Sequence, residues 1–164
     1  MLLALRHVAA FLALPFVMAG VIPYFIVRRT HAALAMQWPL LAVAALLAIA
    51  GATLFITSLY EFGTRGRGTL APWDPPRKLV VHGPYRYVRN PMITGVVLLI
   101  ATEAALFASQ SVGEWALLFA AINAIYIPLL EEPMLAERFG ADYEEYCKNV
   151  PRLIPRMTPW TPAS

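Results

Sequence analysis

Residues 82–95 decide the fold, and they read His82-Gly-Pro-Tyr-Arg-Tyr-Val-Arg-Asn-Pro-Met-Ile-Thr-Gly95. The first half of this stretch is polar and carries two arginines and two tyrosines, and the second half opens an apolar helix. A second polar cluster, Glu131-Glu132-Pro133, follows the next apolar stretch. If the two apolar stretches form a helical hairpin, both polar clusters lie at the same end of it. We therefore expect a site for a charged small molecule beside lipid.

Outward from this stretch, the chain of 164 residues is 59% hydrophobic and only 14% charged. Soluble domains carry about 25% charged residues. A membrane-spanning helix needs about 20 apolar residues. The pattern therefore predicts an all-α integral membrane protein, a single domain over residues 1–164, with about four transmembrane helices. The expected spans are His7–Val27, Trp38–Tyr60, Met92–Ala108 and Val112–Leu130.

Residues 1–60 would then hold the first two spans, and residues 61–164 a loop, the helical hairpin and a tail. The first stretch lacks a small-residue cleavage site, and a second span follows it. We therefore expect it to remain as a span rather than to be removed as a signal peptide.

The basic residues give the orientation. With four spans, eleven of the thirteen lysines and arginines fall on the side of both termini and of the loop 61–91, and only Arg28 and Arg29 fall on the other side. Positive charge collects on the cytoplasmic side of membranes, so both termini are expected there. The isoelectric point near 9.2 indicates a basic face for anionic lipid headgroups. No nucleic-acid motif occurs, so no nucleic-acid partner is expected.

Redox and metal chemistry have little support. Cys147 is the single cysteine of the chain, which rules out an internal disulfide. His7, His31 and His82 lie far apart without ligand spacing, so no metal site is expected.

Two readings of the polar clusters stay open from the residues alone. Pro84 can begin a helical turn that places Tyr85 and Arg89 on one face; alternatively, the arginines anchor the cytoplasmic face and the tyrosines form an aromatic belt. Glu131 and Glu132 can bind a cation, or they can favour the dipole of a helix begun by Pro133. A short helix near the C-terminus is expected to be capped by Asp142 with Glu145 and to end near Val150.

Two polar residues stand inside the expected hairpin, Glu103 in one helix and Asn123 in the other. A carboxyl group within a span usually faces a polar interior or a partner. Either the two side chains hydrogen-bond and join the helices, or they line a substrate cavity.

The motifs resemble one known family. The segments Leu79-Val80-Val81 and Gly83–Pro91, then Glu131-Glu132-Pro-x-Leu135, are similar to isoprenylcysteine carboxyl methyltransferases, a group related to phospholipid methyltransferases. The likeness continues through Phe139-Gly140 to Val150-Pro-Arg152 and covers roughly half of the chain.

The resemblance implies S-adenosylmethionine as methyl donor, bound on the cytoplasmic side between the loop, the Tyr85 turn and the glutamates. It implies that the short C-terminal helices help to form this site, and that the protein is of the bacterial inner-membrane type. In the matching, Glu131 or Glu132 takes the donor's ammonium and Arg89 its carboxylate. The implied donor-binding residues are Arg77, Lys78, Leu79, Val80, Tyr85, Arg89, Asn90, Pro91, Met92, Ile93, Glu131 and Glu132.

Two departures from the eukaryotic pattern concern the substrate. This chain has Asn90 where that pattern has histidine, and Ile93 where it has an aromatic residue. It also has Ile127 where the eukaryotic enzymes carry a substrate-associated arginine four residues before the first glutamate. A prenylcysteine carboxylate thus loses its expected partner. Ile127, with Glu103 and Asn123, is a candidate substrate-binding position.

The function predicted from these features is methyl transfer from S-adenosylmethionine to a lipophilic or amphiphilic acceptor that enters from the bilayer. No residue is assigned as a covalent catalyst. A non-catalytic membrane scaffold and a small transporter subunit are the alternatives, the latter suggested only by the two polar residues within the spans. Nothing in the sequence specifies the accepting atom or an oligomeric state.

Overall fold

The computed structural model describes residues 15–66 and 78–162, and every regular element within these ranges is helical. This confirms the all-α class. The elements, in chain order, are η1 (Val17–Val21), α2 (Ile22–Thr30), α3 (Trp38–Arg65), η2 (Gly83–Arg86), α4 (Pro91–Leu106), α5 (Gln110–Tyr126), η3 (Ile127–Glu131), α6 (Glu132–Phe139) and α7 (Ala141–Asn149).

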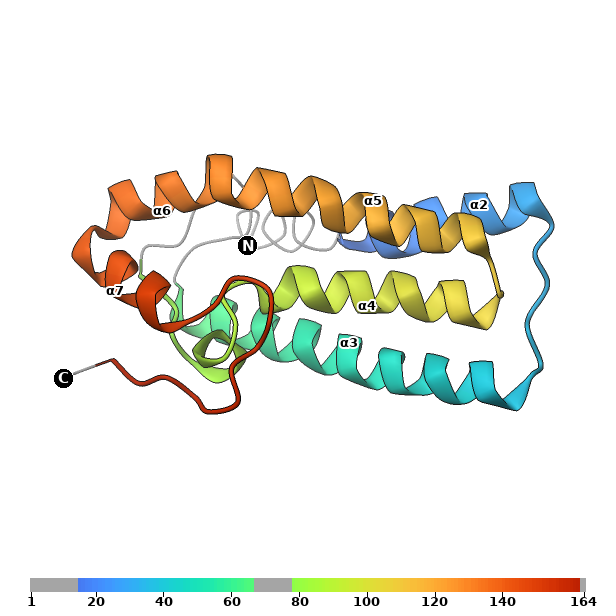
Figure 1. The fold of residues 1–164 in the computed structure, drawn as a ribbon, viewed down its shortest axis with the longest axis horizontal. Coiled ribbons are helices and arrows are strands. Elements are labelled where there is room, and N and C mark those ends of the chain that lie inside the picture. Colours follow the sequence, from blue (N-terminus) through green and yellow to red (C-terminus); the bar gives the residue numbers. More distant parts are fainter. Residues whose placement is uncertain (1–14, 67–77, 163–164) are drawn as a thin grey trace, which may run out of the picture.

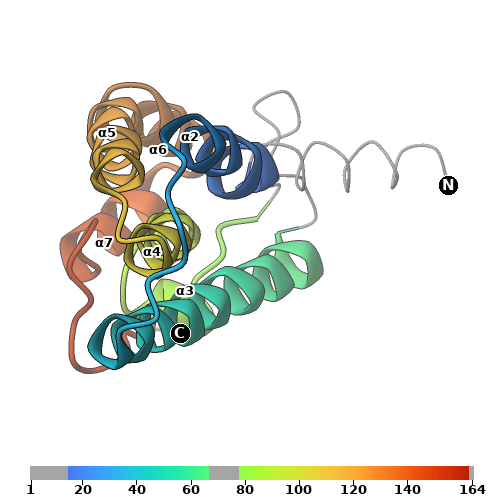
Figure 2. The same cartoon turned by 90° about the vertical axis from the view of Figure 1, so that its right-hand side faces the viewer.

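The long helices run side by side, with α4 between α3 and α5 (Figures 1 and 2). Helix α2 lies beside α5, and the segment that follows it crosses one end of the bundle to reach α3. The backbone N–H of Ala35 in this segment donates to the carbonyl of Leu106 at 2.7 Å, so the crossing segment is fixed to the last turn of α4. We call α3, α4 and α5 the apolar bundle.

The expected hairpin of α4 and α5 is confirmed, and its connection is shorter than the sequence suggested. Only Phe107–Ser109 separate the two helices, because α5 already begins at Gln110. Ser109 is the N-cap of α5, and its hydroxyl accepts from the Val112 N–H at 3.4 Å. Buried side chains from both helices, with Ile100 of α4 and Val112 of α5 fully enclosed, form the core of the hairpin.

Helices α3 and α4 approach each other closely at a pair of glycines. A Cβ atom added to Gly51 would lie 3.0 Å from the carbonyl oxygen of Gly95. One added to Gly95 would lie 2.9 Å from the carbonyl oxygen of Gly51 and 2.9 Å from the backbone nitrogen of Phe55. Since these neighbours are backbone atoms, they cannot move aside as a side chain can. Small residues permit this kind of close helix packing in membranes.

The fourth apolar stretch continues without a break into the polar region. The sequence led us to expect a new helix begun by Pro133, and Pro133 does lie in the first turn of α6. However, α5, η3 and α6 form one helical run from Gln110 to Phe139. The π-helical turn of η3 contains Pro128, which has no N–H to donate, and a local change of helical pitch accommodates such a residue.

Two helices of the described ranges are long and apolar enough to cross a membrane: Trp38–Arg65 and Gln110–Phe139. The first of these covers the whole of the second expected span and continues five residues beyond it. Helix α4 has 16 residues and is shorter. The first expected span lies partly in residues 1–14, outside the described residues, and its described part lies in η1 and α2; α2 continues past Val27 to Thr30 and ends where His31 adopts a left-handed conformation (φ 52°). Four spans therefore stay a prediction.

The end of the molecule beyond α4 and α5 is built from short pieces, namely residues 78–90, α6, α7 and the tail 150–162 (Figure 1). We call it the polar end. Its buried cluster joins Val81 to Tyr143, Tyr146 and Val150. The expected helix near the C-terminus ends at Asn149, as predicted, but its N-cap is wrong: the cap is Gly140, whose φ of 54° an L-residue rarely adopts, and not Asp142.

Candidate functional site

The turn at residues 83–90 forms one wall of the site. A 3₁₀ turn spans Gly83–Arg86 with Pro84 as its second residue, so the helical turn predicted at Pro84 is present. Gly83 has a φ of 53°, and a Cβ atom there would lie 2.9 Å from Cγ of Glu61. The turn is therefore packed directly against the C-terminal end of α3, where Glu61 also pairs with Arg65 at 2.7 Å.

Tyr85 occupies the centre of the site. Its backbone carbonyl accepts a hydrogen bond of 2.7 Å from the hydroxyl of Tyr146 in α7. Burial raises the pKa of the Tyr85 phenol, the negative charge of Glu131 raises it further, the Ser58 hydroxyl lowers it, and Glu61 adds a smaller rise. The phenol is therefore protonated at neutral pH and lies within the electrostatic reach of two carboxylates.

The tail folds back over the turn and is bound to it through the backbone (Figure 1). Arg89 N–H donates to the Pro151 carbonyl at 2.9 Å. Arg156 N–H donates to the Tyr87 carbonyl at 3.0 Å, and Trp160 N–H donates to the Arg86 carbonyl at 3.0 Å. The sequence correctly excluded regular helix from this proline-rich tail. It did not reveal that the tail closes the site.

An ion-pair group connects the turn, α6 and the tail. Arg152 holds Glu132 through two hydrogen bonds of 2.7 Å each, from Nε and Nη2. Arg89 Nη1 lies 3.2 Å from the same carboxylate and also donates to Cys147 Sγ. Arg89 and Glu132 are largely enclosed, with side chains 11% and 16% exposed. The interpretation of Arg89 as only a charged anchor at the membrane surface is therefore incomplete, because its guanidinium points into the protein.

Glu131 differs from its neighbour. The described residues give its carboxylate neither a hydrogen bond nor an ion pair, although it is only partly exposed and lies near Tyr85. A carboxylate that is partly withdrawn from water favours a cationic partner. Of the two consecutive glutamates, Glu132 is thus already neutralised by arginines and Glu131 is available.

The remaining positions implied for the donor lie around the same turn. Lys78 donates its N–H to the Gly66 carbonyl at 3.3 Å, and Leu79-Val80 lead from there into the turn, with Val80 buried. Asn90 precedes α4 without a side-chain capping bond. The three residues after it begin α4: Pro91 at the first position, buried Met92, and Ile93 against the bundle core. Arg77 lies outside the described residues.

Of the three candidate substrate positions, Asn123 and Ile127 lie one helical turn apart, with the Ile127 N–H donating to the Asn123 carbonyl, and Glu103 lies away from both. Asn123 Nδ2 donates to the Phe119 carbonyl of its own helix at 2.8 Å. Glu103 lies near the tip of the hairpin, where Ala104 faces Gly113, so Asn123 is ten residues further along α5. At 1.5 Å rise per residue this is roughly 15 Å, and the interpretation of a helix-joining hydrogen bond is wrong. Ile127 is 1% exposed and packed inside the protein.

Sequence reasoning missed three contributors. Ser58 and Glu61 lie one helical turn apart on α3 and face the Tyr85 turn, and Ser58 is fully buried. Their i, i+3 spacing was visible in the sequence, but no sequence feature showed which face of α3 the Tyr85 turn would pack against. Arg152 belonged to the quoted motif, and only the fold brings it to Glu132.

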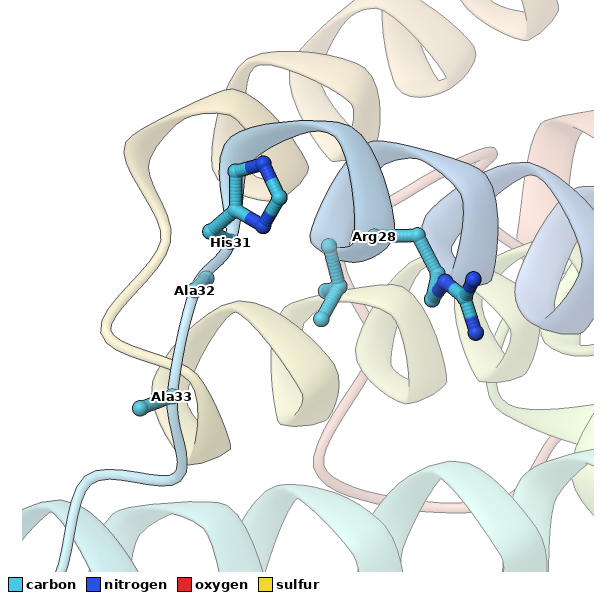
Figure 3. Close-up of a pocket in the computed structure, with 5 residues that line it drawn as sticks. Arg28, His31, Ala32 and Ala33 are labelled. Atoms are coloured by element: carbon cyan, nitrogen blue, oxygen red, sulfur yellow. The ribbon is translucent and has the colours of Figure 1, made fainter.

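A shallow hollow of about 400 Å³ lies at the opposite end of the molecule, lined by Val27, Arg28, His31, Ala32 and Ala33 (Figure 3). Arg28 is already engaged there with the ring of Tyr24, 5.8 Å from its centroid. None of the expected site residues lines this hollow. Within residues 15–66 and 78–162, no group of three or more histidine, cysteine or acidic side chains has an arrangement that can hold a metal ion.

Comparison with known proteins gives two matches. The family described as phospholipid methyltransferase matches residues 40–142, which is more than half of the chain. A methanethiol S-methyltransferase 2 from Bradyrhizobium diazoefficiens is 37% identical over 76 residues, covering 44% of this chain and 27% of that protein. The chain thus spans about a quarter of the length of this relative. No solved structure matches.

Proposed function

Because this chain belongs to the phospholipid methyltransferase family, we propose that it is a membrane methyltransferase that transfers a methyl group from S-adenosylmethionine to a lipophilic or amphiphilic acceptor. The observation that carries this proposal is the carboxylate of Glu131, which has no partner among the described residues and lies beside the Tyr85 turn, next to the arginine-rich group around Glu132. One pole of the site is negative and the adjacent pole is positive.

The residues of the site fit the charged groups of the donor. S-adenosylmethionine carries an ammonium, a carboxylate and a sulfonium. Glu131 suits the ammonium through a charge-assisted hydrogen bond, and Arg89 suits the carboxylate. The face of Tyr85 suits a cationic sulfonium. Leu79-Val80 would lie against the adenosine through backbone and apolar contacts.

The donor supplies an activated methyl group, and the protein has to orient two reactants and exclude water. The enclosed cluster of Val81, Tyr143, Tyr146 and Val150 keeps one side of the site dry. Tyr146 fixes the turn through its bond to the Tyr85 carbonyl. A displacement at methyl needs no covalent enzyme intermediate, so these residues act by binding and positioning.

The acceptor is proposed to reach the site from the bilayer. The outward faces of α3 and α5 are apolar, with Leu46, Ile49 and Leu117 among the exposed residues. Ile127 places no charge beside the glutamates, which disfavours a free prenylcysteine carboxylate relative to a neutral acceptor. The name of the Bradyrhizobium relative makes a small apolar thiol a first candidate to assay.

We place the protein in the inner membrane of a bacterium, with both termini and the donor site on the cytoplasmic side. The split of eleven against two basic residues supports this orientation. Fusion of a reporter to Ser164 tests it: a cytoplasm-active reporter should work, and a periplasm-active one should not. The reverse result would separate the site from the cytoplasmic donor and overturn the topology.

Donor binding is the experiment that tests the function. The full chain, solubilised in detergent, should bind S-adenosylmethionine and its demethylated product in a calorimeter, and it should transfer labelled methyl to an apolar thiol or lipid acceptor. A scaffold or a transporter subunit needs no such binding. No heat and no thermal shift at millimolar donor would exclude the methyltransferase and leave those alternatives.

A further inference from the structure

We propose that Arg152, in the C-terminal tail, is a positioning residue of the donor site: it holds Glu132 so that the Arg89 guanidinium is kept in place for the donor's carboxylate. The inference rests on the proposed function and deepens it. It assigns opposite tasks to the two consecutive glutamates, with Glu131 binding the ammonium and Glu132 serving as an internal counter-ion.

The charge balance of the group is the first argument. Glu132 contributes one negative charge, and Arg89 and Arg152 contribute two positive charges within 3.2 Å and 2.7 Å of it. One positive charge therefore remains, on a group whose two inner members are largely enclosed. An enclosed excess charge favours an anionic partner, and the carboxylate of the donor is one.

Arg89 has an unused donor. Its Nη1 is occupied by Glu132 and Cys147, and its backbone N–H by the Pro151 carbonyl. Its Nε is buried and donates to no acceptor in the part of the chain that the structure describes. Buried donors without a partner are rare in proteins and call for an explanation. A ligand carboxylate would supply the missing acceptor.

Arg152 determines how strongly the Glu132 carboxylate interacts with Arg89. Both of its hydrogen bonds to the carboxylate are 2.7 Å long, whereas the contact of Arg89 is longer, at 3.2 Å. The bidentate geometry is available to arginine and not to lysine. Without Arg152, the full charge of Glu132 falls on Arg89, where it competes with the ligand's carboxylate. Arg152 thus acts through Glu132 and touches no ligand itself.

The test compares two donors in the full-length protein: S-adenosylmethionine and its decarboxylated form, which keeps the ammonium and sulfonium. In Arg152→Gln, affinity for S-adenosylmethionine should fall about tenfold or more, while affinity for the decarboxylated donor should change less than about twofold. The matched control is Arg138→Gln, which removes the same charge from an exposed position in α6. It should change neither affinity.

Two further variants sharpen the test. Arg152→Lys keeps the charge without the bidentate geometry and should lie between wild type and Arg152→Gln; it also decides the matter if the glutamine variant does not fold. Arg152→Gln combined with Glu132→Gln removes the competing carboxylate and should recover part of the lost affinity.

Equal losses for both donors would show a purely structural role and overturn the inference, and so would an unchanged affinity for S-adenosylmethionine. If the wild-type protein binds neither donor, the proposed function itself fails. If it binds both donors equally well, the function stands and the assignment of Arg89 to the carboxylate is wrong.

Discussion

In the apolar bundle, α3 and α4 meet through backbone atoms at Gly51 and Gly95, with no room for a methyl group. In the polar end, hydrogen bonds and ion pairs between residues far apart in sequence join the turn, α6 and the tail; Arg86 Nε, for example, donates to the Trp160 carbonyl at 2.8 Å, across 74 residues. The bundle is therefore sensitive to volume and the polar end to charge and hydrogen bonding. Substitutions of each kind should have their largest effects in different regions.

The largest expected effect is on the bundle. Gly95→Leu places a side chain against the Gly51 carbonyl and the Phe55 backbone nitrogen, both 2.9 Å from the new Cβ atom. Backbone cannot relax as a side chain does, so the variant should lose about 3 kcal/mol or more, the upper range for overpacking. Thermal unfolding in detergent measures this loss.

Gly113→Ala is the matched control for the glycine crossing. Its new Cβ atom would meet only the Cβ of Ala104, at an ordinary 4.0 Å. Because alanine favours helix over glycine, this variant should be neutral or more stable by up to about 1 kcal/mol. If both variants unfolded alike, the tight crossing would not be the feature that stabilises α3 against α4.

The second effect concerns ligand binding at the polar end. Glu131→Gln should weaken binding of S-adenosylmethionine by about 1.5–3 kcal/mol, the usual contribution of a hydrogen bond to a charged group. Because Glu131 has no partner among the described residues, the stability of the free protein should hardly change. Calorimetric titration and thermal unfolding of the same sample measure the two quantities separately.

Glu145→Gln serves as the control for Glu131, since Glu145 is exposed on α7. It removes the same charge at the same end of the molecule. Equal donor affinities of the two variants would show that Glu131 only favours the dipole of the helix that follows it, which is the alternative its position before Pro133 leaves open.

The sequence predicted the bundle well because the signals for it are local. The length of the apolar run Trp38–Tyr60 predicts α3 to within five residues at its end, and Pro91 marks the start of α4. The short link between the third and fourth runs predicts their hairpin. Each of these features depends on residues adjacent in the chain.

The polar end was predicted only as a set of residues without their contacts. The motif selected Arg89, Glu131 and Glu132, but it gave no reason to pair Glu132 with Arg152, because that pair forms only when the tail returns to the turn. Ser58 and Glu61 were missed for the same reason. Their role depends on which face of α3 the turn packs against, and helical periodicity in an apolar span does not mark that face.

The third effect tests how firmly α7 holds the turn. Tyr146→Phe removes the hydroxyl that donates to the Tyr85 carbonyl at 2.7 Å and keeps the ring that packs 5.9 Å from Trp160. Loss of one such bond should cost about 1 kcal/mol of stability. Hydrogen exchange should accelerate in residues 83–90 and not in α4. The exposed Tyr60→Phe is the control, and a uniform acceleration in both regions would contradict a local role for this bond.

The smallest expected effect is at Asp142, the residue that the sequence suggested as a helix cap. If Asp142 capped α7, replacing it with alanine would cost about 1 kcal/mol. The structure places Gly140 at that position, and Asp142 is exposed in the first turn, where its charge only favours the helix dipole. The better helix propensity of alanine offsets that small loss, so Asp142→Ala should change stability by less than about 0.5 kcal/mol.

The contrasting variant is Gly140→Ala. Gly140 caps both the end of α6 and the start of α7, and alanine there would have to adopt φ 54° and ψ −129°, so this variant should cost about 1–3 kcal/mol of stability. Chemical denaturation of the two variants ranks them, and a larger loss for Asp142→Ala would restore the capping interpretation.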